Sequence, residues 1–90
     1  MPSKKFPLGD VVITTNAKDV LHPEDVTRAL ARHVSGDWGE VCEADRYQND
    51  LSLEQSLRLL SVYFDRDQTK FWIITEADRS ATTILLPDDY

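Results

Sequence analysis

The last third of the chain constrains the fold most, because three successive segments there are rich in β-branched and aromatic residues. These segments are residues 57–64, 70–76 and 81–86. Polar residues separate them, at 65–69 and in the bend Glu76-Ala77-Asp78-Arg79-Ser80, as is typical of short strands joined by turns. Pro87 has no amide proton with which to continue the last strand. We therefore predict three consecutive antiparallel strands, a meander.

The amino-terminal half predicts one further strand and two helices. Residues 11–15 are β-branched and favour a strand, and residues 17–21 fit a single helical turn. Residues 23–34 begin with proline, carry acidic side chains in the first turn and repeat apolar residues at helical spacing, so they predict a helix. A second, polar helix is expected from residues 41–43 to Leu51. The predicted architecture is α+β in the order β-α-α-β-β-β, an antiparallel meander sheet packed against two helices.

The strand-like segments 70–76 and 81–86 are apolar on both faces. We expect helices to cover one face of the sheet and turns or a partner protein to cover the other. The last strand, which ends near Pro87, is expected at a sheet edge, where a second chain can pair with it. An apolar sheet of this kind favours self-association, so a homodimer is one expected assembly.

Composition narrows the class of protein. Ninety residues are expected to form a single domain, with residues 1–5 as a mobile terminus. Acidic residues outnumber basic residues 16 to 10, and the net charge of −6 disfavours nucleic-acid binding, because phosphate contacts need clustered Lys and Arg. No apolar run is long enough to cross a membrane. Cys42 is the only cysteine, so we expect a reduced, cytoplasmic protein.

Neither a metal site nor a cofactor is expected from the sequence. His22 and His33 are too far apart to be a helical i, i+4 ligand pair, and Cys42 has no second thiol at ligand spacing. The chain has three scattered glycines, which are too few and too dispersed to form a phosphate-binding loop.

Four residues are candidates for catalysis. His33 titrates near neutral pH and is a candidate general acid or base, and Arg79 is a candidate for stabilising negative charge. Ser80 or Thr83 would donate a hydrogen bond, and Thr83 is expected opposite Thr75 on the sheet. This set would suit metal-independent RNA cleavage. The element order is also loosely similar to the bacterial ribonuclease toxins of the barnase and RelE type.

Each of these candidates has a structural alternative. His33 would bond the last carbonyls of its helix and pack beside Trp38. Asp78 would accept backbone N–H bonds within the bend, and Arg79 would pair with Glu76 or Asp45. The residues considered for binding a partner are Asp37, Trp38, Asp45, Glu76, Asp78 and Arg79. The acidic segment from Asp37 to Asp50 is expected either to dock a basic protein or to be a solvated helix surface.

Three blocks of the chain resemble a family of small bacterial proteins that are often labelled hypothetical or plasmid-related. The blocks are residues 31–40, Asp45-Arg46 with Asn49-Asp50, and residues 73–87. The resemblance implies a link to mobile elements and implies no particular activity. The favoured hypothesis is a non-enzymatic cytoplasmic protein-interaction or accessory domain associated with mobile elements. The alternative is a metal-independent ribonuclease or toxin-like domain, and nucleic acid is an expected partner only under that alternative.

Overall fold

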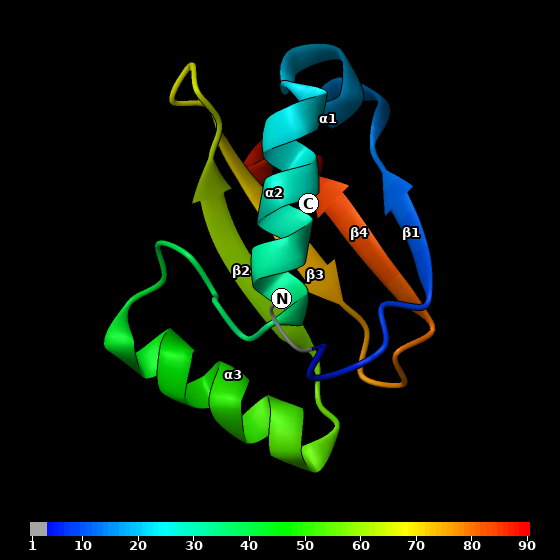
Figure 1. The fold of residues 1–90 in the computed structure, drawn as a ribbon, viewed down its shortest axis with the longest axis vertical. Helices are drawn as coiled ribbons and strands as arrows, with labels where there is room; N and C mark the ends of the chain where they lie inside the picture. Colours follow the sequence, from blue (N-terminus) through cyan, green and yellow to red (C-terminus); the bar gives the residue numbers. More distant parts are fainter. Residues whose placement is uncertain (1–3) are drawn as a thin grey trace.

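The computed structural model describes residues 4–90, which form a four-stranded sheet with helices against one face (Figure 1). The strands are β1 (Asp10–Ile13), β2 (Leu59–Phe64), β3 (Lys70–Thr75) and β4 (Ala81–Leu85). The helices are α1 (Thr15–Val20), α2 (Pro23–Val34) and α3 (Glu43–Gln55), and a 3-10 turn, η1 (Pro87–Asp89), follows β4. The strand order across the sheet is β1-β4-β3-β2.

The α+β class is confirmed, but the predicted arrangement is wrong in part. The helical turn predicted at residues 17–21 is found as a short helix, α1, so the fold has three helices rather than two. The sheet is mixed rather than a purely antiparallel meander, because β1 pairs parallel with β4. This pairing joins Asp10 to Ala81 across most of the chain. It places β4 inside the sheet, so the prediction that the last strand is an edge is also wrong. The edge strands are β1 and β2.

The predicted helix at residues 23–34 is confirmed as α2. Pro23 occupies its first turn with Glu24 and Asp25, which suit the positive end of the helix dipole. The chain leaves the helix through Gly36, whose φ of 88° lies in the left-handed region that favours glycine. Figure 1 shows α2 running across the sheet, whereas α3 lies beyond the amino-terminal end of β2. None of the described helices has both the length and the apolar character needed to span a bilayer.

The main core fills the space between α1, α2 and the sheet. Its buried members are Ala17, Leu21, Ala29, Tyr63, Phe71, Ile73 and Ile84. A second cluster, formed by Phe6, Trp38 and Leu59, lies toward α3. Of the terminus predicted to be mobile, residues 1–3 lie outside the described part of the chain. Lys5 is tied to α2, because its backbone N–H donates to the Val34 carbonyl at 2.8 Å.

Candidate functional site

The outer edge of β2 is covered by hydrogen bonds at Leu60 and Val62. The side-chain amide of Asn49 pairs with the backbone of Leu60, accepting from its N–H at 3.1 Å and donating to its carbonyl at 2.6 Å. The next outward-facing residue is Val62, whose N–H donates to the Trp38 carbonyl while its own carbonyl accepts from Glu40. Every backbone group that β2 turns outward at these two positions therefore has a partner within the molecule.

Gly39 allows the covering segment to approach β2 this closely. Its φ is 74°, and a Cβ atom built on it would lie 2.0 Å from the Val62 carbonyl oxygen. The Arg32 guanidinium holds the preceding turn through two bonds to the Asp37 carboxylate, at 2.7 and 3.2 Å. Trp38 is buried and donates from Nε1 to Asp50 at 2.9 Å. Asp37 and Trp38, predicted as binding residues, thus form part of the segment that covers this edge. They also line a surface cavity of about 340 Å³ with Arg46.

The edge of β1 is open. Asp10 donates its N–H to Ser80 and Thr14 donates to Ile84, at 2.9 and 3.0 Å, so these residues face β4. Because backbone groups alternate in direction along a strand, the N–H and C=O groups of Val11 and Ile13 point away from the sheet. Within residues 4–90 no strand lies on that side, and Figure 1 shows β1 at the border of the molecule.

The side chains of this open edge are apolar and exposed. Val11, Val12 and Ile13 are 46%, 49% and 38% exposed. A cavity of about 340 Å³ lies beside the strand on the helix-covered face, lined by Ile13, Lys18, Leu21, Pro23, Val26 and Thr27. Outward-facing backbone groups next to an apolar groove are the two features that a domain needs to bind an extended peptide as an added strand. We call Val11, Val12, Ile13 and this groove the β1 edge site.

His33 is completely buried at the centre of a hydrogen-bonded chain. Its Nδ1 lies 2.5 Å from the Ser61 hydroxyl, and its Nε2 lies 2.8 Å from the Thr75 hydroxyl. The Thr75 hydroxyl lies 2.8 Å from that of Thr82, which donates to the Leu8 carbonyl at 2.7 Å. The predicted burial beside Trp38 is confirmed by a ring contact of 5.6 Å. The predicted bonds to helix carbonyls are replaced by bonds to hydroxyl groups of the sheet.

The Leu8 carbonyl, the last acceptor of this series, fixes which group donates in each hydrogen bond between it and His33. A carbonyl can only accept, so Thr82 uses its single proton on Leu8 and must accept from Thr75. Thr75 in turn accepts from the Nε2–H of His33. Burial, and secondarily the positive charge of Arg79, lower the pKa of His33 to about 3, so the imidazole is neutral near pH 7. With its proton on Nε2, the neutral ring accepts from the Ser61 hydroxyl at Nδ1.

His33 and Arg79 do not open onto a common site. Phe6 lies between them, with its ring centroid 5.3 Å from that of His33 and 5.5 Å from the Arg79 guanidinium carbon. Arg79 donates to the backbone carbonyls of Ser52, Leu57, Glu76 and Ala77. These bonds fasten the β3–β4 turn to the end of α3. Both side chains are thus engaged by the protein itself.

The remaining predicted site residues are dispersed around the sheet. Thr75 faces Thr82, not Thr83 as predicted, and Thr83 lies on the opposite face because successive side chains alternate. Asp78 accepts the Ser80 N–H at 3.0 Å, which confirms its predicted turn role, and the Ser80 hydroxyl and N–H lower the pKa of Asp78. Glu76 pairs weakly with Arg58, at 3.8 Å, rather than through its side chain with Arg79. Asp45 is exposed on α3.

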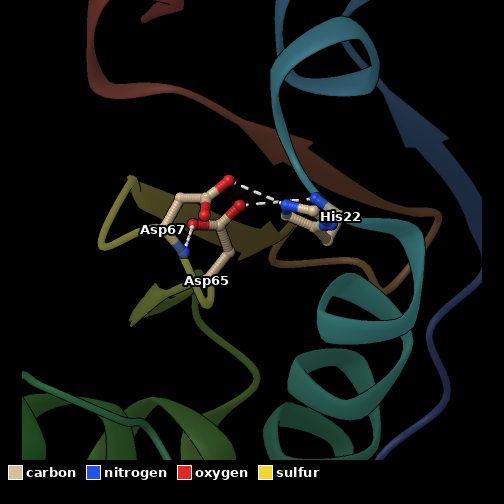
Figure 2. A group of neighbouring side chains, drawn as sticks. All are labelled: His22, Asp65 and Asp67. Carbon is tan, nitrogen blue, oxygen red and sulfur yellow. Dashed lines mark hydrogen bonds and ion pairs between the residues drawn. The ribbon is translucent and has the colours of Figure 1, made fainter.

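Sequence reasoning missed one group of side chains with the spacing to hold a metal ion, His22, Asp65 and Asp67. One ligand atom from each lies within 4.8 Å of the others. Figure 2 shows Asp65 and Asp67 facing His22 from the β2–β3 turn, with His22 Nε2 and the Asp67 carboxylate 2.8 Å apart. Asp65 is 2% exposed, and its carboxylate already accepts the N–H groups of His22, Asp67 and Thr69. Within residues 4–90, these contacts make the group a junction between the start of α2 and the turn. The Asp-x-Asp spacing at 65–67 was the only local signal for it.

Comparison of the chain with protein-family models, with curated proteins and with solved structures found no match.

Proposed function

We propose that this protein is a non-enzymatic protein-binding domain that pairs the open edge of β1 with an extended segment of a partner. The contrast between its two edges carries the proposal. Side-chain and backbone groups satisfy the outward-facing backbone groups of Leu60 and Val62 on β2, whereas Val11 and Ile13 on β1 have no such cover within residues 4–90. Exposed strand edges are hazardous, and proteins usually blunt them with charges, proline or a covering segment. Here the exposed edge is apolar.

The β1 edge site offers both affinity and selectivity. A partner strand would satisfy the backbone groups of Val11 and Ile13, which gives register but little sequence preference. Selectivity would come from the groove between Ile13 and Val26, which can receive an apolar side chain. Burying the exposed half of a valine or isoleucine contributes about 1 kcal/mol. Such a site suits a modest, reversible affinity, because association also costs translational freedom and side-chain ordering.

The hydrogen bonds that His33 and Arg79 make within the protein also support binding rather than catalysis. A general base needs an open face toward the proton that it removes, and both imidazole nitrogens are bonded within the core. The net charge of −6 would repel an RNA substrate rather than attract it.

A library of random peptides displayed on phage tests the proposal. Wild type should enrich peptides with alternating apolar residues, and these peptides should protect the Val11 and Ile13 amides from hydrogen exchange. Val11→Pro removes the outward N–H while leaving the bonds between β1 and β4 intact, so it should abolish binding. Val11→Thr keeps the donor and the branched shape and should retain most of the binding. Peptides that bind Val11→Pro as well as wild type would show that the ligand site lies elsewhere.

A further inference from the structure

We infer that the strand received by the β1 edge site is β1 of a second copy of this chain, so that two four-stranded sheets join into one. The inference rests on the proposed function and names its partner. Pairing would be antiparallel about a two-fold axis, the commonest symmetry of soluble oligomers.

The sequence of β1 admits one register that uses all its outward groups. With the axis at Val12, Val11 of each copy lies opposite Ile13 of the other, and each such pair exchanges two backbone hydrogen bonds. With the axis at Val11, Ile13 would instead face Gly9, whose φ of 66° takes it out of the strand. With the axis at Ile13, Val11 would face Thr15, which begins α1. The strand is therefore self-complementary about Val12.

The side chains fit the same register. Val11 and Ile13 pair with Thr82 and Ile84, which are buried under the helices, so their side chains lie on the helix-covered face. Val11 of the second copy would thus lie beside Ile13 at the mouth of the groove. On the other face, Val12 would meet Val12 across the axis.

The distribution of exposed apolar residues supports a dimer at this place. Eight large apolar side chains are exposed among residues 4–90. Four of them, Val11, Val12, Ile13 and Val20, lie on β1 and the adjoining α1. An isologous interface buries such a patch on both subunits at once, which satisfies the patch without any further protein.

Repulsion between like charges opposes this dimer, so the dependence of dimerisation on salt identifies it. Asp10 is the only charged residue of β1, and in this register it lies opposite Thr14 of the second copy. Thr14 donates to the Asp89 carboxylate at 2.6 Å, so Asp10 would approach a like charge there. Each copy also carries a net charge of −6. Added salt should therefore strengthen the dimer, because screening weakens this repulsion.

Sedimentation equilibrium over micromolar to millimolar concentrations measures the assembly. Wild type should shift from its 10.3 kDa monomer to twice that mass, at lower concentration when salt is raised. Val11→Pro should remain monomeric, with circular dichroism showing that the fold is kept. Tyr47→Lys, which changes an exposed aromatic residue on α3, should dimerise like wild type.

A cysteine in place of Val12, on the proposed two-fold axis, tests the register directly. In a Cys42→Ser background, Val12→Cys should form an intermolecular disulfide, because Cα atoms of a non-hydrogen-bonded pair lie about 4.5 Å apart, within the disulfide range. Tyr47→Cys in the same background gives the collisional rate, which should be at least tenfold lower.

Each remaining outcome overturns the inference. A wild type that stays monomeric at millimolar concentration, with no rapid Val12→Cys cross-link, removes the second copy as partner. Binding of library peptides at β1 in that case would leave the proposed function standing. A dimer that persists in Val11→Pro places the interface away from β1.

Discussion

The Nε2–H of His33 donates to the Thr75 hydroxyl over 2.8 Å, and this bond joins α2 to the end of the inner strand β3. Nε2 can donate in either protonation state of the ring, but Nδ1 can accept from the Ser61 hydroxyl only while the imidazole is neutral. Stability should therefore depend on the protonation of one buried side chain.

We expect the free energy of unfolding to fall as the pH drops below 6.5. The pKa of His33 is about 3 in the folded protein against 6.5 in its ordinary environment. Between these two pH values the imidazole is protonated in the unfolded chain but not in the folded chain. Protonation of His33 alone therefore lowers the free energy of unfolding by about 1.4 kcal/mol per pH unit. The effect is absent above pH 6.5. Urea titrations between pH 7 and pH 4 measure it.

The control for this dependence is His33→Gln, which cannot titrate in this range. It should be less stable than wild type at pH 7, because it disturbs the buried hydroxyl chain, but its stability should fall less steeply. If both proteins lose stability with the same slope between pH 6.5 and pH 5, His33 is not the group responsible.

Thr75→Val should destabilise the protein by about 1–3 kcal/mol, because it leaves a buried imidazole N–H without an acceptor and removes one of the two partners of the Thr82 hydroxyl. The matched control is Thr83→Val, which makes the same change at a half-buried position on the other face of the sheet. The control should change stability by less than about 0.5 kcal/mol. Chemical denaturation decides between them, and equal effects would argue against a special role for the hydroxyl chain.

Gly39→Ala should open the protected edge of β2. The new methyl group would lie 2.0 Å from the backbone oxygen of Val62, so the covering segment must move. We expect a loss of at least about 2 kcal/mol, together with faster amide exchange at Val62 and Glu40.

Gly36→Ala provides the comparison for this substitution. Gly36 also has a positive φ, but its new methyl group would meet only the flexible side chain of Lys5, at 2.9 Å. It should cost about 1–2 kcal/mol from the backbone alone and leave exchange at Val62 unchanged. Equal exchange rates in the two variants would contradict the role assigned to Gly39.

Asp65→Asn should destabilise the β2–β3 turn by about 1–2 kcal/mol, because an amide nitrogen cannot accept the backbone N–H groups that the carboxylate accepts. Asp67→Asn is the control, since the Asp67 side chain is 67% exposed and its loss should cost less than about 0.5 kcal/mol. Thermal unfolding of the two variants measures the difference. A larger loss from Asp67→Asn would assign the junction to the His22 pair instead.

The local sequence pattern was sufficient to predict the elements whose ends are set by neighbouring residues. Pro23, the acidic first turn and Gly36 mark both ends of α2, and the three carboxyl-terminal strands lie within two residues of their predicted bounds. The polar helix α3 runs to Gln55, beyond the predicted Leu51, because Ser56 takes the left-handed conformation that ends it. No local signal marks that residue as a helix end.

The sequence did not reveal which distant segments pair with each other. The pairing of β1 with β4 joins segments 71 residues apart, as Asp10 and Ala81 show, and nothing in either segment specifies the other. Thr82 and Thr83 are chemically equivalent in the sequence, and only the register of β4 decides which one lies under α2. The residues that we assign to binding, Val11 and Ile13, were visible as a strand but not as an edge.

Strand alignment is the property that the buried hydroxyl chain secures. A sheet with apolar residues on both faces loses little burial when one strand slides by a single position. Such a slip of β4 would turn Thr82 outward, leaving the Thr75 proton without an acceptor and the Leu8 carbonyl without a donor. The misaligned chain would thus bury unsatisfied polar groups, and this penalty selects the native alignment.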